Sequence, residues 1–186
     1  MMDGSSALSA RIYQIPGGVE GVKATLRAMV ATVRAFTKPK PHDSEKIAGL
    51  LSVRLTAQNI VQGLPPKDYW AEANALFLFV RDHIRYVRDM RQMETLYFPD
   101  KTLALKAGDC DDMAMLFAAL AETIGFETRF CAIGVDGEEF SHVSAQCLVP
   151  GFGWVNAETI PIDDKGSKMP FGWFPPDATC LMLAHV

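Results

Sequence analysis

The sequence has little of what marks nucleic-acid-binding, membrane or secreted proteins. Its 18 lysines and arginines are outnumbered by 22 acidic residues, which gives a formal net charge of −4. Proteins that bind nucleic acid or anionic lipid through charge carry a basic surplus, so we expect neither kind of partner. No window approaches the roughly 18 uninterrupted apolar residues of a membrane-spanning helix. The first residues also lack the basic and apolar regions of a signal peptide, so we expect a soluble, intracellular protein.

Cysteine is also scarce, and its spacing excludes the common metal and redox motifs. Cys110, Cys131, Cys147 and Cys180 form no C-x-x-C pair, and without a secretion signal we expect them to be free thiols. The acidic cluster at 109–112 does not follow the ligand pattern of a calcium loop, and the cysteines and histidines lack paired zinc-ligand spacing. We therefore expect no metal and no cofactor.

Length and hydrophobic patterning predict one domain, 1–186, whose first half is helical. The chain is 49% hydrophobic, which suffices for a single globular core. Apolar residues recur at helical spacing in three segments. These are 21–38, a segment from Ser44, the expected N-cap, through Ile60, and a segment from about Lys67 to Val87. We interpret residues 1–66 as a helical N-terminal extension of the core that follows.

In the second half the hydrophobic period shortens from about four to two. Four short runs rich in β-branched or other apolar residues predict the strands of one antiparallel sheet. They lie at 128–135, 142–149, 153–160 and 178–185. The fold class that follows is α+β, with helices first and then a sheet.

The stretch "GDCDD" places an ionisable thiol among three aspartates. An apolar stripe over 111–124, followed by a glycine, predicts a helix with Asp109 at or just before its N-cap and Cys110 in or beside its first turn. A helix N-terminus favours a thiolate and offers N–H groups to an oxyanion. Cys110 is therefore a candidate nucleophile. The neighbouring aspartates oppose a thiolate, so the chemistry needs a base nearby.

Of the four histidines, His142 is the best placed to be that base. His42 lies in a Pro- and Lys-rich linker, and His83 lies among charged residues of a predicted helix. His185 is the penultimate residue, where we expect fraying. His142 instead opens a predicted strand, from which its side chain could meet a residue at the start of a packed helix.

An acid that would orient His142 is expected on the next strand. In "GWVNAE", alternation puts Glu158 on the same face as Trp154 and Asn156. Asn156 is an alternative for the orienting role, because an amide also serves it. Trp154 and Asn156 are, with Asp109, candidates for the substrate cleft or the oxyanion hole.

The same residues also have a purely structural interpretation. A helix cysteine is often simply buried, a histidine at a strand start is often only hydrogen-bonded, and a strand glutamate is often a surface residue. The order of Cys110, His142 and Glu158 along the chain favours catalysis. The other three cysteines lie in apolar strands, where core packing is the better interpretation.

Three segments together resemble the transglutaminase-like superfamily of cysteine enzymes, whose core is similar to that of papain: "GDCDDMAMLFAALAETIGFETRF", "HVSAQCLV" and "GWVNAE". The resemblance implies a transglutaminase-like core over 67–186, with Cys110 as nucleophile, His142 as general base and Glu158 as the acid, which is more often aspartate in the family. It also implies a thioester intermediate and a peptide or protein substrate. Water as acceptor would make a peptidase or amidase, and an amine would make a crosslinking acyltransferase.

A narrower resemblance rests on "IPGGVEGVKATLRAM", the doubled acid of "GDCDD" and "PFGWFPP". These are similar to small transglutaminase-like proteins of tailed phages and prophages. That resemblance implies a protein in the bacterial cytoplasm or on a virion, with phage virion proteins as partners. Two alternatives to an enzyme stay open, a non-enzymatic assembly protein and a peptide-binding domain on the same fold.

Overall fold

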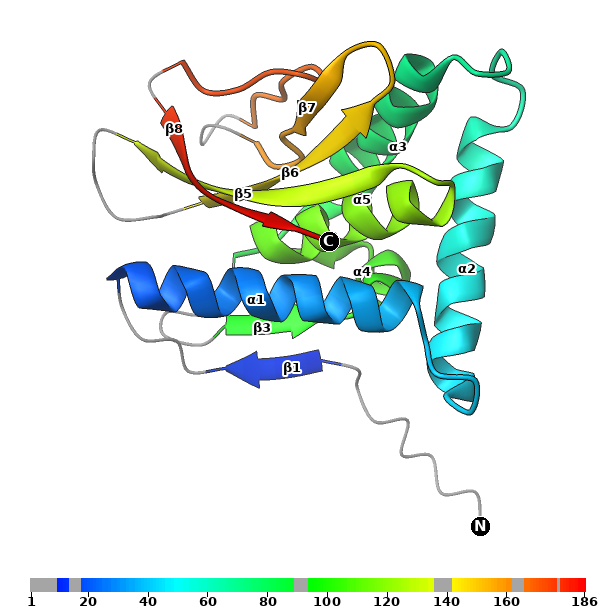
Figure 1. The fold of residues 1–186 in the computed structure, drawn as a ribbon, viewed down its shortest axis with the longest axis horizontal. Coiled ribbons are helices and arrows are strands. Elements are labelled where there is room, and N and C mark those ends of the chain that lie inside the picture. The colour runs from blue at the N-terminus through cyan, green and yellow to red at the C-terminus, as the bar shows by residue number, and fades with distance from the viewer. Residues whose placement is uncertain (1–9, 14–17, 89–93, 136–141, 162–165, 177) are drawn as a thin grey trace.

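The computed structural model describes residues 10–13, 18–88, 94–135, 142–161, 166–176 and 178–186. Helices fill most of the first half and a four-stranded sheet ends the chain, which confirms the α+β class (Figure 1). The elements, in chain order, are β1 (Ala10–Tyr13), α1 (Gly18–Thr37), α2 (Ser44–Val61), α3 (Tyr69–His83), β2 (Arg85–Tyr86), β3 (Glu94–Tyr97), α4 (Pro99–Leu105), β4 (Ala107–Gly108), α5 (Cys110–Thr123), β5 (Glu127–Val135), β6 (His142–Val149), β7 (Gly153–Ala157) and β8 (Ala178–His185).

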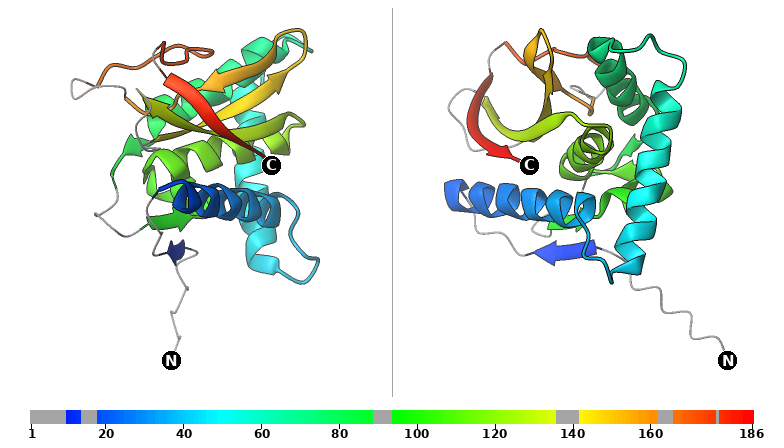
Figure 2. Two further views of the ribbon diagram at one scale, coloured as in Figure 1. Left: turned by 60° about the vertical axis from the view of Figure 1, so that its left-hand side comes forward. Right: turned by 45° about the vertical axis from the view of Figure 1, so that its right-hand side comes forward.

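Helix α5 lies at the centre of the molecule. It contacts α1, α2, α3 and α4 as well as β5 and β6, and Figure 2 shows it between the other helices and the sheet. Every residue from Asp111 to Ala121 is buried. The apolar stripe predicted for this helix is therefore only part of its buried surface, because its alanines also pack, as in a helix enclosed on all sides.

The sheet has the strand order β7-β6-β5-β8 and is antiparallel throughout. Both β6 and β8 have the predicted bounds, and β5 begins one residue earlier than predicted. Strand β7 ends at Ala157, before the predicted Ile160, so Glu158 lies just beyond the strand. The backbone pairing of β6 with β7 stops at the pair Ala145–Ala157.

Helix α5 and the part of β5 that pairs with β6 have similar lengths. From Cys110 to Thr123 the helix rises about 20 Å. Strand β5 then runs back, and from Glu127 to Ile133 it also covers about 20 Å. Ile133 pairs with His142 in β6. From these lengths we expect the first residue of β6 near the height of the first residue of α5.

Two helix boundaries differ from the sequence-based prediction. Helix α2 is capped by Asp43, whose Oδ1 accepts from the Lys46 N–H at 3.2 Å, so Ser44 is the first helical residue rather than the cap. Helix α3 ends at His83, although the periodic pattern predicted helix as far as Val87. The following residues leave the helix because they pair with β4, a partner distant in sequence.

Five further elements, four short strands and one helix, were not predicted. Strands β1 and β3 form an antiparallel two-stranded sheet, and β2 and β4 form a parallel one. Helix α4 begins at Pro99, a residue well suited to the first turn of a helix. These elements are short, and their pairing or packing partners lie elsewhere in the sequence, so local periodicity gave no signal for them.

Candidate active site

Asp109 fixes the start of α5. Its Oδ1 accepts hydrogen bonds from the backbone N–H groups of Asp111 and Asp112, both at 3.0 Å. This is the N-cap interaction predicted from the sequence. Because the cap occupies these two N–H groups, an oxyanion hole at the start of α5 has to draw on other donors.

The backbone just before Cys110 is held by the short parallel ladder of β2 and β4. Strand β4 ends at Gly108, whose carbonyl accepts from the Val87 N–H at 2.9 Å. A Cβ added at Gly108 would lie 2.6 Å from the Asp112 Cβ. Glycine therefore lets α5 approach this ladder closely. In the G-D-C motif, Gly108 allows close packing, Asp109 caps the helix and Cys110 carries the thiol.

Cys110 is partly buried and its thiol contacts Asp111. The Sγ donates to Asp111 Oδ1 at 3.6 Å. Because a carboxylate accepts the S–H and repels a thiolate, this contact stabilises the neutral thiol. The side chain of Asp112 instead accepts from the Tyr97 N–H at 2.8 Å and joins β3 to α5. The sequence suggested that nearby aspartates oppose a thiolate at Cys110. In the structure, Asp111 is the aspartate in direct contact with this thiol.

His142 and Glu158 are joined by a hydrogen bond. His142 Nε2 lies 2.7 Å from Glu158 Oε2, and the Ile160 N–H donates to Glu158 Oε1 at 3.4 Å. The glutamate side chain is 2% exposed and the histidine 19%. A carboxylate only accepts hydrogen bonds, so this contact assigns the ring proton to Nε2 and leaves Nδ1 as the basic nitrogen. The longer glutamate side chain therefore reaches the imidazole.

Asn156 lies on β7 as predicted, but its side chain contacts other groups. Its Oδ1 accepts from Ser144 Oγ at 2.8 Å, and its Nδ2 donates to the Trp173 carbonyl at 2.9 Å. The amide thus ties the sheet to the segment after residue 166. Glu158 is the residue that contacts the His142 ring.

Trp154 lies at the other end of β7, in a cluster of its own. The Arg129 guanidinium stands 4.1 Å from the centroid of a Trp154 ring, and His185 packs edge-on against the same side chain. His185 belongs to β8, where it pairs with Arg129, so the expectation that it frays is wrong. Sheet pairing orders this end of the chain, which position in the sequence alone did not reveal.

The other cysteines divide into two kinds. Cys147 is free, and burial, together with the charge of Glu122, raises the pKa of its thiol to about 12. Cys131 is buried and disulfide-bonded, so the expectation of four free thiols is wrong for this residue. Sequence spacing carries no information on disulfides between residues that only folding brings together. The side chain of Cys180 lies outside the described part of the chain.

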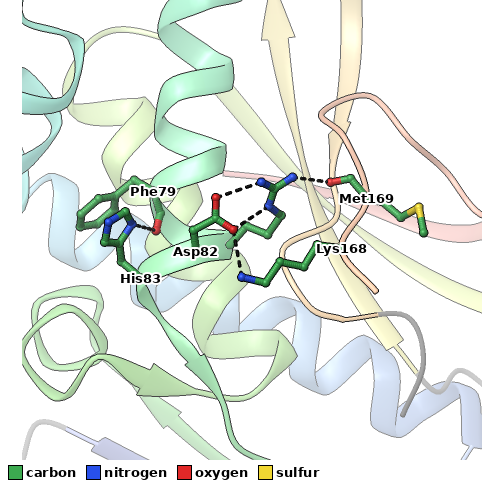
Figure 3. Close-up of polar contacts among 6 residues, drawn as sticks. Phe79, Asp82, His83, Lys168 and Met169 are labelled. Atoms are coloured by element: carbon green, nitrogen blue, oxygen red, sulfur yellow. Dashed lines mark hydrogen bonds and ion pairs between the residues drawn. The ribbon is translucent and has the colours of Figure 1, made fainter. Parts of the chain in front are cut away.

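The other histidines and acidic residues form no metal-binding cluster in the described part of the chain. His83 is exposed, its Nδ1 lies 3.1 Å from the Phe79 carbonyl, and its ring stacks on Phe79 (Figure 3). His42 is exposed as well.

No group of three or more potential metal ligands occurs among the described residues. Nor does a helix among them have the length and apolar surface needed to cross a membrane.

A cavity of about 640 Å³ opens beside the candidate residues. One part of its wall is Met113, one turn after Cys110 on α5, and another is the pair of residues that directly follow Glu158. The end of α3, strand β2 and Arg88 complete much of the lining. The cavity therefore lies between α5 and the residues that follow β7, and its described lining does not include Cys110, His142 or Glu158 themselves.

Sequence reasoning missed the cations of this cavity. Arg81, Arg85, Arg88 and Lys168 all line it. The sequence analysis gave the arginines no role, because they are interleaved with the apolar residues of the helical pattern that was followed to Val87. The signal that could have revealed them is the surplus of arginine just before the cysteine motif in an acidic chain.

The comparisons with known proteins concern the family and the fold. The family model of the transglutaminase-like superfamily matches residues 54–159. A "putative protease" from Parabacteroides distasonis has a TM-score of 0.52 at 12% identity, and the match covers 74% of this chain and 29% of that one. For a "putative cysteine protease" from Cytophaga hutchinsonii the TM-score is 0.48 at 14% identity, with 78% and 54% covered. No match was found among curated proteins.

These similarities differ in what they show. The Parabacteroides protein is much longer, since this chain spans 29% of it, and at 12% identity the likeness shows the fold alone. The family model is more informative, because it extends from α2 to the residue after Glu158 and includes Cys110 and His142. It covers more than half of the 186 residues. This chain therefore belongs to the transglutaminase-like superfamily.

Proposed function

We propose that this protein is a cysteine hydrolase that cleaves amide or peptide bonds through Cys110, His142 and Glu158. The observation that carries the proposal is the 2.7 Å contact between His142 Nε2 and Glu158 Oε2. It orients the imidazole and leaves Nδ1 to accept a proton. Support comes from the position of Cys110 at the N-terminus of α5 and from the cavity between α5 and the end of β7.

In the proposed reaction, Nδ1 of His142 takes the proton of the Cys110 thiol and the sulfur adds to the substrate carbonyl carbon. The π electrons of the carbonyl move to its oxygen, and the oxyanion forms at the positive end of α5. Collapse breaks the C–N bond, the amine leaves with the proton from Nδ1, and the acyl group stays on sulfur as a thioester. Water, deprotonated by Nδ1, then releases the acid and restores the thiol.

Glu158 also stabilises the imidazolium that forms during this reaction. The carboxylate is 2% exposed, so solvent screens its attraction for the imidazolium only weakly. Asp111 acts in the opposite direction, because it stabilises the neutral thiol. The two carboxylates therefore act in opposite directions on the transfer of the proton from the thiol to the imidazole.

The acceptor decides whether the product is an acid or a new amide. Attack by an amine on the thioester would give transamidation through the same steps and the same residues. Water is the acceptor that is always present, which favours hydrolysis. A peptidase or amidase is therefore the form of the proposal that we put first.

Alkylation by iodoacetamide at neutral pH tests the nucleophile and its base. Cys110 is expected to react at least roughly a hundredfold faster than Cys147, which is buried and whose raised pKa keeps it protonated. The variant His142→Ala should remove most of the reactivity of Cys110, and His42→Ala, at an exposed position, should leave it unchanged. Equal rates at Cys110 in the wild type and His142→Ala would exclude His142 as the base.

Cleavage is tested by mass spectrometry of a synthetic peptide mixture incubated with the protein. Products that together gain one water are expected with the wild type and not with Cys110→Ala. Products joined to an added amine would instead indicate an acyltransferase.

A non-enzymatic binding role is the second candidate, favoured by the contact of the Cys110 thiol with the Asp111 carboxylate. In that case Cys110 would alkylate no faster than a small-molecule thiol, and no peptide would be cleaved. The same two experiments thus separate both functions.

A further inference from the structure

Another cavity lies at the far end of α5 from Cys110. It has a volume of about 540 Å³. Three parts of the chain line it: the start of α3, the residues directly after α5, and the turn between β6 and β7 with the strand ends beside it. Helix α5 rises about 20 Å from Cys110 to its last residue, Thr123. The cavity is therefore separate from the three candidate catalytic residues.

Aromatic side chains gather at this cavity. The rings of Tyr69 and Phe126 meet edge to face with their centroids 6.4 Å apart, which joins the start of α3 to the residue before β5. In the turn between β6 and β7, Phe152 is 62% exposed and lies between two glycines of the lining. Its ring packs on Trp70 at 4.7 Å, beside the start of α3 (Figure 1). Exposed apolar side chains that gather around a concave surface are typical of a site that binds a partner.

The charge of the described lining is entirely negative. It includes two glutamates, Glu72 and Glu127, and no lysine or arginine. Glu72 lies one turn after Tyr69 on α3, and Glu127 directly follows Phe126, so each of these two walls carries one ring and one carboxylate. Within the described part of the chain, neither carboxylate is engaged in a hydrogen bond or an ion pair. Their charges are therefore available to a ligand.

We propose that this cavity binds the guanidinium group of an arginine side chain from a peptide or protein partner. Carboxylates without a partner attract a cation, and a guanidinium donates two parallel hydrogen bonds to one carboxylate. The same planar group packs on aromatic rings, which Tyr69 and Phe126 supply. The aliphatic stem of an arginine can contact the apolar part of the lining, which includes Ile124.

A metal ion fits this cavity less well than a guanidinium. The described residues contain no group of three or more histidine, cysteine or acidic side chains that could hold a metal. The proposal does not rest on the proposed function, because the cavity lies at the other end of α5 from Cys110. It adds an interaction site to the protein whether or not Cys110 is a nucleophile.

Binding is tested with two small compounds that differ in charge. One is the N-acetyl, N-methylamide form of arginine, and the other is the same form of citrulline, in which a neutral urea replaces the guanidinium. Nuclear magnetic resonance of the isotope-labelled protein follows each titration. We expect the arginine compound to shift the backbone amide signals of Gly125, Phe126 and Gly151 in a saturable way. The citrulline compound should bind roughly fivefold more weakly, as expected from the loss of two partly exposed ion pairs.

The double variant Glu72→Gln, Glu127→Gln should lower the affinity for the arginine compound by roughly fivefold and leave that for the citrulline compound unchanged. The matched control removes two exposed glutamates on α1 and α2, Glu20→Gln with Glu45→Gln, and should change neither affinity. If the double variant does not fold, salt gives the same answer on the unmodified protein. At about 1 M it should weaken binding of the arginine compound alone.

Three results would overturn the proposal. They are equal affinities for the two compounds, an equal loss of affinity in the control variant, and the absence of any saturable shift in the signals of the cavity. None of these measurements depends on alkylation of Cys110 or on peptide cleavage. Failure of the arginine site and failure of the proposed hydrolase are therefore distinguishable.

Discussion

Glu158 is almost fully buried, and its Oε2 lies 2.7 Å from Nε2 of His142. A carboxylate in this position both orients the ring and stabilises its protonated form. The two effects can be separated by substitution, because an amide oxygen accepts the same hydrogen bond without a charge.

Glu158→Gln should therefore keep the ring orientation and lose only the charge. We expect Cys110 alkylation at pH 7 to fall by roughly tenfold, because the imidazolium loses the attraction of a buried carboxylate. Glu158→Ala should cost more, since the ring also loses its orientation. Intact-mass kinetics with iodoacetamide measure both variants. Wild-type rates in Glu158→Ala would show that the pair has no part in activating the thiol.

Asp111→Asn should make Cys110 more reactive at lower pH. The carboxylate that accepts the thiol hydrogen at 3.6 Å stabilises the neutral form, and an amide oxygen does so without repelling a thiolate. The midpoint of the alkylation rate against pH should move to lower pH. Asp68→Asn, at the distant N-cap of α3, is a suitable control for a single lost charge. An unmoved midpoint would mean that Asp111 does not tune the thiol.

Gly108→Ala should destabilise the protein by about 1–3 kcal/mol, the usual cost of overpacking. The added Cβ would lie 2.6 Å from the Asp112 Cβ, and Asp112 is anchored to Tyr97. Gly49→Ala provides the comparison, because its closest contacts would be Asp100 Oδ2 at 2.7 Å and Cγ at 2.8 Å, in a carboxyl group that can rotate, while the Asp100 Cβ would be farther away at 3.2 Å. Urea unfolding should rank Gly108→Ala as the more damaging of the two. The reverse order would contradict the packing argument.

Glu122→Gln should stabilise the protein at neutral pH. Glu122 Oε1 accepts from the N–H and Oγ of Thr128, both at 2.9 Å, and a glutamine oxygen can accept the same bonds. Burial, the largest cause, raises the pKa of Glu122 above 4.5 in the folded protein. A raised carboxyl pKa favours folding below the unfolded value and is lost as pH rises through the folded one.

The benefit of Glu122→Gln should therefore grow as pH rises past 4.5 and level off above the folded pKa. Thermal unfolding between pH 4 and 7 measures it, with Glu45→Gln, at an exposed position on α2, as the control. A benefit that is already complete at pH 4 would point to a cause other than ionisation.

Local signals predicted the elements that hold the candidate site. The stripe and cap of α5 and the alternation of β6 are properties of consecutive residues, and both were found as expected. The end of α3 was predicted wrongly, because pairing of β2 with β4 replaces the last helical turn. The disulfide of Cys131 and the cavity lined by Arg85 depend on segments that meet only in the folded chain. The phage setting stays a prediction from sequence resemblance.

The contact between His142 and Glu158 lies past the last backbone pair of β6 and β7, Ala145 with Ala157. Beyond that pair, the side-chain hydrogen bond still joins the start of β6 to the residue that follows β7. Loss of either residue would remove this link, and loss of His142 would also remove the proposed base. A related protein without the nucleophilic cysteine would still have a structural reason to keep both partners. The histidine and glutamate pair would then identify it as a member of this superfamily.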